Sequence, residues 1–481
     1  MAARLAARLA ARLAAMGGPC YLIGAGGRAR KRFRRPAPRH RAKTMSVRER
    51  NMRETVMRGL AAGLVGLGLA TGWAGPAAAF QPPAAVEAAQ AGFDAARLEA
   101  IAAFVQRDVA AGKIPGMVLL VMRDGRPVLT RAFGEQTPGA PMRLDSIHRI
   151  ASTTKLFVTT AAMRLYEQGR FKLSDPVATY LPELKALTVY AGAESATEGD
   201  VPPPVAPQRA PTIHDLMRHT AGFTYWWIGP ANAVRRNQRA QNLEGLYDLT
   251  GEEMLGKLAQ QPLLYQPGST FEYSIATDVL GHLLERLEGK PLDRIVAEQV
   301  LEPLGLQDTV WQVDDTRAAR LAEPSQQIRE TDPLAWVYTW LDLRKAPQRF
   351  SGGAGLASTA GDVGRLLQML ANGGAIDGVR LLAPQTVRLM LHSDHLNGIK
   401  GPRNNVDPGY GWSLVNPVRL GSGPHATPGA AGDVYWGGIT GPRYMIDPAE
   451  RLVVVALFQA PSLRGHYYAI LRQMVYGAMT K

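Results

Sequence analysis

The segment Arg149-Ile-Ala-Ser152-Thr-Thr-Lys155-Leu-Phe-Val places a serine three residues before a lysine, within apolar surroundings. A serine hydroxyl is a poor nucleophile at neutral pH and needs a base beside it. If Ser152 begins a helix, Lys155 lies one turn later on the same face. A lysine can act as that base where burial or a neighbouring cation favours its uncharged form. The segment therefore predicts a serine acyl-transfer enzyme that uses no histidine.

The Ser-x-x-Lys pattern has a plainer interpretation when it is taken alone. It is expected to arise by chance about once in a chain of this length. In that alternative, Ser152 caps a helix and Lys155 is an ordinary surface residue. Other parts of the sequence must therefore decide between a catalytic pair and a helix start.

The length and the charge distribution of the chain limit its domain organisation and its binding partners. The chain has 481 residues, 46% of them apolar, and a formal charge of +14. Such a length exceeds the ~250–300 residues at which a single core stops growing, which predicts two lobes. Residues 1–58 hold 16 of the 55 Lys/Arg and 2 of the 41 Asp/Glu, so the remainder is formally neutral. Nucleic-acid binding therefore has no support.

The basic N-terminal region is typical of a targeting segment. A charged stretch from Met45 to Arg58 precedes the apolar run 59–72, and Ala77-Ala78-Ala79 resembles a signal-peptide cleavage site. We expect an exported protein, periplasmic or secreted, in which residues 1–79 are removed. Residues 80–481 then form a single catalytic domain. The alternative is an uncleaved membrane anchor, although the run is short and glycine-rich for a span of ~20 residues.

Two further points concern this leader. The repeats and arginines of residues 1–44 precede the signal, so Met45 or Met52 is a candidate for the true start. The only cysteine of the chain, Cys20, also lies there. We therefore expect no disulfide and no thiol nucleophile in the mature protein.

The pattern of the mature chain predicts a mixed α/β fold. Apolar residues recur at helical spacing after Asp94, and an apolar run over 117–122 is joined by Asp124-Gly125 to a second strand over 127–133. Residues 190–211 are rich in proline, alanine, glycine and glutamate and predict a surface excursion, whereas 212–345 is mainly helical in pattern. Strands are predicted again at 443–447 and 452–458, and a last helix at 464–476. This order predicts an antiparallel sheet, with strands from both chain ends, flanked by helices and interrupted by a mainly helical lobe at about 152–345.

Several segments in this order resemble the serine β-lactamase and penicillin-binding-protein superfamily, most closely the class C β-lactamase-like, or family VIII, carboxylesterases. The resemblance covers roughly residues 90–475. The segments that carry it are Asp145-Ser-Ile-His-Arg-Ile-Ala-Ser152-Thr-Thr-Lys155, Thr212-Ile-His-Asp-Leu-Met-Arg-His-Thr-Ala-Gly222, Gln266-Pro-Gly-Ser-Thr-Phe-Glu-Tyr273, Glu302-Pro-Leu-Gly-Leu-Gln-Asp-Thr309, Gly353-Ala-Gly-Leu-Ala-Ser-Thr-Ala-Gly-Asp362 and Trp436-Gly437-Gly438. The last of these occupies the place of the Lys-Thr-Gly strand motif. A β-lactamase/transpeptidase-like fold is therefore expected.

The resemblance implies a role for each matched residue. Ser152 is expected to be the acylated nucleophile, with Lys155 holding or relaying its proton. Tyr273 is expected to act with Lys155 as a second base, and as the acid toward the leaving group. The backbone N–H groups of Ser152 and Ile439 are expected to form the oxyanion hole. Gly437 and Gly438 leave a bare strand edge that a substrate can approach closely.

Two departures from the β-lactamase pattern concern the substrate. The asparagine two residues after the tyrosine is replaced by Ile275, which cannot bond an amide side chain. The first residue of the strand motif is Trp436, an apolar wall in place of a charge that would hold a carboxylate. Both changes favour a neutral ester over an anionic β-lactam. Tyr225 and Trp226 are predicted to line an apolar acyl pocket, although core packing explains them equally well.

Other readings of the sequence have less support. There is no Gly-x-Ser-x-Gly segment, which argues against an α/β-hydrolase. His214 and His219 have the wrong spacing for paired ligands on a helix, so buried hydrogen bonding is expected and no metal or other cofactor is predicted. β-Lactamase, D-alanyl carboxypeptidase and acyltransferase activities stay open as alternatives, as does a non-catalytic penicillin-binding-like protein. The expected partner is a small-molecule ester or related acyl substrate, with no oligomeric state predicted.

Overall fold

The computed structural model describes residues 86–192, 203–421 and 423–480. The chain divides into two compact units, Met1–Gly75 and Pro76–Lys481, and every described residue belongs to the second. The predicted signal segment, its cleavage site and Cys20 lie outside the described residues. In the part that is described, no helix has both the length and the apolar character needed to cross a membrane.

The framework is an eight-stranded antiparallel sheet with the order β3-β2-β1-β12-β11-β10-β9-β8. Its strands are β1 (Gly116–Arg123), β2 (Arg126–Thr137), β3 (Ala140–Pro141), β8 (Tyr410–Trp412), β9 (Pro417–Arg419), β10 (Val434–Gly437), β11 (Arg443–Asp447) and β12 (Leu452–Phe458). The first long strand, β1, pairs along its length with the last, β12. The prediction of a sheet built from both chain ends is therefore confirmed.

The hairpin between β1 and β2 follows from its turn residues. Asp124 and Gly125 have φ values of 53° and 74°. A two-residue hairpin turn of this kind needs positive φ at both positions, which aspartate and glycine tolerate best. The predicted strands at 117–122 and 127–133 are confirmed.

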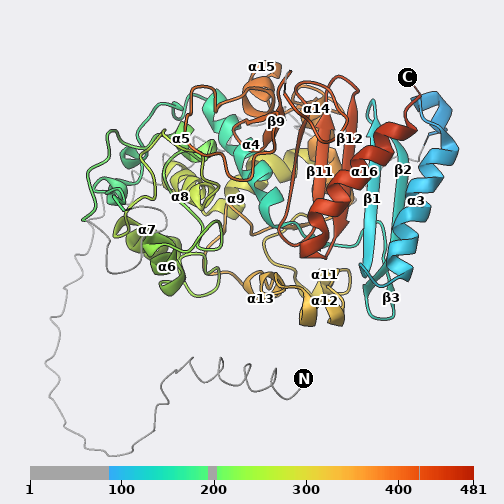
Figure 1. Cartoon of the computed structure of the whole chain (residues 1–481), viewed down its shortest axis with the longest axis horizontal. Coiled ribbons are helices and arrows are strands. Elements are labelled where there is room, and N and C mark those ends of the chain that lie inside the picture. Colours follow the sequence, from blue (N-terminus) through green and yellow to red (C-terminus); the bar gives the residue numbers. More distant parts are fainter. Residues whose placement is uncertain (1–85, 193–202, 422, 481) are drawn as a thin grey trace, which may run out of the picture. The chain divides into compact units, whose positions relative to one another are not determined.

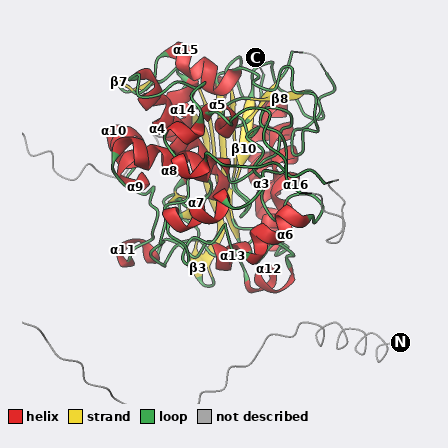
Figure 2. Cartoon of the chain, turned by 90° about the vertical axis from the view of Figure 1, so that its left-hand side faces the viewer, coloured by secondary structure: helices red, strands yellow, loops and turns green. Residues whose placement is uncertain are grey.

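Both faces of the central strands are buried. In β1, Met117, Leu119 and Val121 belong to one core cluster, whereas the alternating Val118, Leu120 and Met122 belong to the other. Helices α3 (Ala95–Ala110) and α16 (Arg464–Ala478) pack together over the first face, and α14 (Ala360–Ala371) covers the second, as Figure 2 shows from the side. Because helices cover both faces of the sheet, the sequences of β1 and β12 are continuously apolar and do not alternate with polar residues.

Along the chain, most remaining helices come between two short strands, β4 (His148–Arg149) and β5 (Ala357–Ser358). These two strands pair with each other and are not part of the main sheet. The helices are α4 (Thr154–Glu167), α5 (Ile213–Met217), α6 (Ala233–Ala240), α7 (Gly251–Ala259), α8 (Ala276–Glu288), α9 (Leu292–Val296), α10 (Glu302–Leu304), α11 (Asp315–Ala318), α12 (Gln326–Thr331) and α13 (Val337–Trp340). Figure 1 shows α5 to α9 gathered beside the sheet. The mainly helical pattern predicted for 212–345 is confirmed.

Short elements complete the described chain. They are β6 (Ala375–Ile376), β7 (Val379–Arg380), α15 (Pro384–Val387), the π-helical turns Ala297–Leu301 and Arg388–His392, and the 3₁₀ turns Ala88–Ala91, Ala151–Thr153, Val177–Thr179, Pro182–Leu184 and Pro461–Leu463. Within the predicted surface excursion, residues 203–206 and 208–210 are exposed, whereas 193–202 lie outside the described residues.

Candidate active site

Ser152 lies in the 3₁₀ turn that leads into α4. The preceding residue, Ala151, has a left-handed backbone with φ 42°, which is uncommon for a residue other than glycine. The chain before it is fixed by the β4–β5 pair and by a bond from Ile150 N–H to the Leu356 carbonyl at 3.1 Å. This tight turn leaves Ser152 partly exposed, lining a cavity of about 430 Å³.

Lys155 lies in the first turn of α4 and is only 1% exposed. Its Nζ donates to the Gly353 carbonyl at 2.8 Å and to the Tyr225 hydroxyl at 3.3 Å. The same atom lies 4.7 Å from the centre of the Tyr273 ring. The N-cap of α4 is Thr153, without a side-chain cap bond. The alternative of a capping serine with a surface lysine is therefore wrong.

A buried ion pair lies behind Lys155. Asp278 accepts from the Arg349 guanidinium at 2.8 Å and from the Ser351 hydroxyl at 2.6 Å. Burial alone would raise the pKa of the Asp278 carboxyl, but Arg349, Ser351 and Lys155 outweigh it and hold that pKa below its ordinary value. Burial, followed by Asp278, raises the pKa of Tyr225 well above its ordinary value. The Tyr225 hydroxyl that accepts the hydrogen bond from Lys155 is therefore a neutral phenol.

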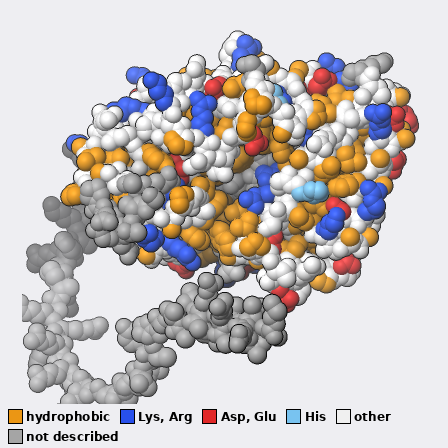
Figure 3. Space-filling view, viewed as in Figure 1, with side chains coloured by type: hydrophobic (Ala, Val, Ile, Leu, Met, Phe, Trp, Pro, Cys, Tyr) orange, Lys and Arg blue, Asp and Glu red, His pale blue; other side chains and the backbone are white. Residues whose placement is uncertain are grey.

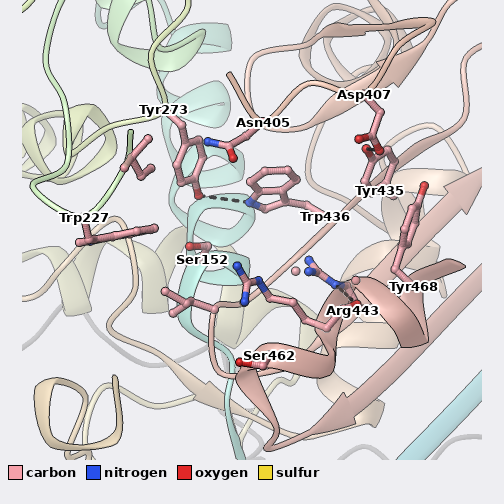
Figure 4. Close-up of a pocket in the computed structure, with 16 residues that line it drawn as sticks. Ser152, Trp227, Tyr273, Asn405, Asp407, Tyr435, Trp436, Arg443, Ser462 and Tyr468 are labelled. Carbon is pink, nitrogen blue, oxygen red and sulfur yellow. Dashed lines mark hydrogen bonds between the residues drawn. The ribbon is translucent and has the colours of Figure 1, made fainter. Parts of the chain in front are cut away.

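Tyr273 lies just before α8 and is 3% exposed. Its phenolic oxygen accepts the indole N–H of Trp436 at 3.2 Å, the dashed line in Figure 4. The His219 ring lies 4.6 Å away, and burial followed by Lys155 holds the pKa of His219 well below its ordinary value. The His219 ring is therefore uncharged. His219 therefore brings no positive charge to the Tyr273 ring, against which Nζ of Lys155 lies.

The end of β10 packs closely against the segment that contains Ser152. A Cβ at Gly438 would lie 2.5 Å from the Ile150 carbonyl oxygen, so only a bare backbone allows this approach. Thr440 adds a hydroxyl bond to the Arg149 carbonyl at 2.7 Å. Among the described residues, neither the Ser152 N–H nor the Ile439 N–H has a hydrogen-bond partner. Two free amides thus lie at the junction that the sequence predicted as the oxyanion hole.

The cavity contains some of the predicted residues and omits others. Ser152, Tyr273, Trp436, Gly437, Gly438 and Ile439 all line it, in the arrangement that Figure 4 shows. It omits Ile275, which is 1% exposed and belongs to the core, and Tyr225, which is buried with its hydroxyl bonded to Lys155. Trp226 packs on Trp336 at 5.4 Å, whereas the next residue, Trp227, lines the cavity.

The two histidines have separate partners. His214 Nε2 lies 2.9 Å from His395 Nδ1, and His219 Nδ1 accepts the Ser274 N–H at 3.3 Å. Buried hydrogen bonding was the expectation for both; it is confirmed for His219, whereas His214 is hydrogen-bonded but only half-buried.

Sequence reasoning missed a set of polar residues in the cavity. They are Asn405, Asp407, Tyr435, Arg443, Ser462, Arg464 and Tyr468. A usable signal existed for Arg443, because it begins a strand that was predicted correctly. Its position opposite Gly437 depends on the pairing of β10 with β11, which the sequence pattern does not specify.

Comparisons with known proteins show what this chain is similar to. The family model described as Beta-lactamase matches residues 101–473. Esterase EstB of Burkholderia gladioli is 32% identical over 403 residues, which are 79% of this chain and 95% of EstB. A putative D-alanyl-D-alanine carboxypeptidase of Escherichia coli is 27% identical over 398 residues, 77% of this chain and 84% of the relative. Among solved structures, EstCE1, described as a hydrolase with promiscuous acyltransferase activity, is 30% identical with a TM-score of 0.62, covering 81% of this chain and 99% of EstCE1.

Proposed function

Because this chain belongs to the beta-lactamase family and is a serine hydrolase, we propose that it cleaves carboxylic esters through an acyl-enzyme formed on Ser152. The observation that carries the proposal is the position of Ser152. Ser152 lines the cavity together with Ile439 and Tyr273, the N–H groups of Ser152 and Ile439 are unpartnered, and Nζ of Lys155, one turn after Ser152, lies 4.7 Å from the Tyr273 ring centre. The relatives named esterase and hydrolase support the same chemistry.

The proposed reaction begins when the Ser152 oxygen attacks the ester carbonyl carbon and its proton passes, directly or through Tyr273, to the uncharged amine of Lys155. The carbonyl oxygen becomes an oxyanion and accepts the N–H groups of Ser152 and Ile439, each such donor being worth ~10²–10³ in rate. Tyr273 then protonates the departing alcohol and regains a proton from Lys155, and the acyl group stays on Ser152. Attack by water repeats these proton transfers and releases the carboxylic acid.

Charge placement supports the role of Tyr273 in this scheme. The Lys155 Nζ, which becomes positive once it takes the Ser152 proton, lies 4.7 Å from the Tyr273 ring centre, and the Trp436 indole donates to the Tyr273 oxygen. Both interactions favour negative charge on the phenolic oxygen. Because Lys155 and Tyr273 are both buried, water screens their interaction weakly.

The choice of ester over lactam remains part of the proposal. Ile275 offers no hydrogen bond where β-lactamases carry an asparagine, and its side chain is buried in the core. An alcohol in place of water as acyl acceptor is a second candidate, since EstCE1 is described as having promiscuous acyltransferase activity. The esterase and hydrolase names of the relatives leave a non-catalytic penicillin-binding-like protein without support.

Short p-nitrophenyl esters test the proposal directly. We expect a burst of p-nitrophenol followed by steady turnover, and an acyl adduct on Ser152 by mass spectrometry. Ser152→Ala should abolish all three, whereas Ser393→Ala, outside the cavity lining, should keep them. Absence of turnover and of any adduct would overturn the proposal. Nitrocefin and a D-alanyl peptide, measured beside the esters, are expected to react more slowly, and a faster reaction with either would reassign the substrate.

We also propose that the protein is exported. The support is the charged and apolar stretch from Met45 to Ala79, which lies outside the described residues. N-terminal sequencing of the native protein should find a start near Phe80. An intact leader on the native protein would contradict cleavage.

A further inference from the structure

Aromatic side chains form much of the wall of the cavity that contains Ser152. They are Trp227, Tyr273, Tyr435, Trp436 and Tyr468. In Figure 4, Trp227 and Tyr468 lie on opposite sides of Ser152, and Figure 3 shows hydrophobic side chains around a hollow in this face of the molecule. Aromatic rings offer large apolar surfaces that pack favourably against other aromatic groups. The wall is therefore suited to a flat, apolar part of a substrate.

The Trp227 indole is held by three neighbours. Its ring stacks on Tyr225, with the centres 5.0 Å apart and the planes 20° apart, and packs against Trp336 at 6.2 Å. Its Nε1 donates to the Glu244 carboxyl at 3.0 Å. Stacking alone lets an indole slide or turn within its plane, whereas a hydrogen bond fixes the direction of the N–H. The bond to Glu244 therefore decides which edge of Trp227 faces the cavity.

Glu244 lies in the turn after α6, behind the cavity wall, and is 4% exposed. Besides the Trp227 indole, its carboxyl accepts the Trp226 backbone N–H at 3.1 Å and the Gln238 amide at 3.1 Å. Its backbone carbonyl accepts the Trp340 indole N–H at 2.8 Å. One buried residue thus ties two consecutive tryptophans of the cavity loop to the turn that contains it.

The Glu244 carboxyl differs from other buried carboxyls of the described fold. Glu272 pairs with Arg235, Asp278 with Arg349, and Asp433 with Arg419. Glu244 forms no ion pair within the described chain, and burial raises its pKa to about 8. A buried carboxyl without a cationic partner costs stability. A perturbed carboxyl beside a cavity is a candidate for a functional role, which here is reached through Trp227.

We propose that Glu244 is a positioning residue that fixes the Trp227 indole in the cavity wall, and that this wall selects esters with an aromatic ring next to the ester bond. The inference rests on the proposed esterase function and narrows its substrate class. The ring can belong to the acyl part, as in an arylacetate, or to the alcohol part, as in a benzyl ester. Glu244 does not line the cavity, so it acts on the substrate only through Trp227.

Pairs of substrates of similar size test the selectivity. On the acyl side, p-nitrophenyl phenylacetate is compared with p-nitrophenyl cyclohexylacetate. On the alcohol side, benzyl acetate is compared with cyclohexylmethyl acetate. Each ratio of kcat/KM, aromatic to saturated, is divided by the ratio for hydrolysis by hydroxide, and an aromatic contact predicts a value of roughly 2 to 10 on at least one side. That side identifies where the ring belongs, and values near one on both sides would overturn the inference.

Variants of the two residues connect this ratio with the hydrogen bond. Glu244→Leu removes the acceptor and Trp227→Leu removes the indole, so each should reduce the ratio at least about twofold. Glu244→Gln should keep the ratio, because the glutamine oxygen can still accept the indole N–H. Trp227→Phe breaks the same bond from the other side and should also reduce the ratio, which keeps the test open if Glu244→Leu does not fold. An unchanged ratio in Trp227→Phe would contradict the positioning role.

A control and a double variant separate positioning from general loosening of the fold. Gln368 is 5% exposed, bonds Asn372 at 2.7 Å and lies outside the cavity lining, so Gln368→Leu should leave the ratio and the basal rate unchanged. If Glu244 acts through Trp227, Glu244→Leu should reduce the ratio no further once Trp227→Leu is present. Independent effects of the two changes would refute this coupling.

A measurement without turnover separates this inference from the esterase proposal. In protein labelled with fluorotryptophan, the Trp227 signal in the fluorine NMR spectrum is assigned by its loss in Trp227→Phe. Glu244→Leu should shift or broaden this signal, whereas Gln368→Leu should not. In Ser152→Ala, the aromatic ester of the favoured pair should shift the signal more than its saturated partner does. If no ester is hydrolysed but these responses persist, the positioning role stands and the esterase proposal fails. If esters are hydrolysed and Glu244→Leu leaves the signal unchanged, the esterase proposal stands and the positioning role is refuted.

Discussion

Trp436 donates its indole N–H to the phenolic oxygen of Tyr273 at 3.2 Å, and the centres of the two rings lie 5.2 Å apart. The sequence suggested only that Trp436 is an apolar wall in place of the lysine of Lys-Thr-Gly. In the structure it also supplies a hydrogen-bond donor to the proposed acid–base group. One side chain thus shapes the cavity and favours charge on the Tyr273 oxygen.

Replacing Trp436 by phenylalanine tests this second role. Trp436→Phe keeps an aromatic wall but removes the only donor that the described structure places on the Tyr273 oxygen. A hydrogen bond to a charged group contributes about 1.5–3 kcal/mol, so kcat should fall roughly 10- to 100-fold. KM should change little, because phenylalanine keeps the aromatic wall of the cavity. Both constants are measured with a p-nitrophenyl ester.

Trp412→Phe is the matched control. Trp412 also packs against Tyr273, at 5.9 Å, but its indole nitrogen has no hydrogen-bond partner among the described residues. This change removes the same ring volume from the neighbourhood of Tyr273 without removing a bond. It should reduce stability and leave kcat nearly unchanged. Equal losses of kcat in the two variants would refute the specific role of the Trp436 donor.

Tyr225 is expected to act as a positioning residue for Lys155. Tyr225→Phe removes one of the two acceptors of Lys155 Nζ and leaves the Gly353 carbonyl. Because Lys155 becomes less well oriented, kcat should fall about tenfold while KM changes little. Lys155→Ala and Tyr273→Phe should cost more, ~10²–10⁴, as expected for a general base.

Tyr180→Phe offers a comparison for Tyr225→Phe. The Tyr180 hydroxyl bonds Asp175 at 2.9 Å and lies outside the cavity lining. Loss of a hydroxyl there should leave kcat unchanged. If Tyr225→Phe also retains full kcat, Tyr225 contributes only packing, and the proposed positioning role is wrong.

Local pattern predicted the long elements well. Strands β11 and β12 match the predicted ranges 443–447 and 452–458, and α16 begins at the predicted residue, Arg464. Their apolar runs and turn residues are sufficient because both faces of the central sheet are covered. The resemblance likewise placed Ser152, Tyr273 and Trp436 at one cavity.

The remaining features depend on contacts between distant segments. The left-handed Ala151 follows the pairing of β4 with β5, and α4 begins only at Thr154. Arg443 reaches the cavity because β11 pairs with β10, and this pairing places Arg443 opposite Gly437. Trp227 lines the cavity in place of the predicted Trp226, and the direction of a loop side chain has no periodic signal in sequence.

Gly438 should be sensitive to the smallest side chain. Gly438→Ala would bring a Cβ within 2.5 Å of the Ile150 carbonyl oxygen and 3.0 Å of the Ala151 Cβ, and would push the β10 end away from Ser152. Because the Ile439 N–H moves with it, kcat for a p-nitrophenyl ester should fall ~10²–10³, the usual effect of losing an oxyanion donor.

Gly256→Ala is the corresponding control for this change. Gly256 lies within α7, and an added Cβ there would meet nothing within 4 Å. Alanine should raise the free energy of unfolding by about 0.5–1 kcal/mol because it favours a helix over glycine. Activity should stay unchanged. A Gly438→Ala variant with normal kcat would show that the strand edge does not position the oxyanion donor.

Glu244 should make stability depend on pH. Burial raises the pKa of its carboxyl to about 8 from an ordinary 4.5, with the nearby Asp278 adding to the rise. Between these two values the folded protein binds a proton that the unfolded chain releases, so the free energy of unfolding falls as pH rises and levels off above about 8. One pKa unit corresponds to ~1.4 kcal/mol. Urea unfolding of the wild type should therefore show a loss of at least about that size between pH 5 and pH 8.

The variant Glu244→Gln isolates this effect from other titrating groups. The glutamine oxygen can still accept the Trp227 indole N–H, which Glu244 accepts at 3.0 Å, but it cannot ionise. The difference in unfolding free energy between variant and wild type should shift in favour of the variant as pH rises toward 8. Glu252→Gln, an exposed position on α7, should show no such trend. A constant difference between Glu244→Gln and the wild type across this range would mean that Glu244 titrates at its ordinary pH in the folded protein.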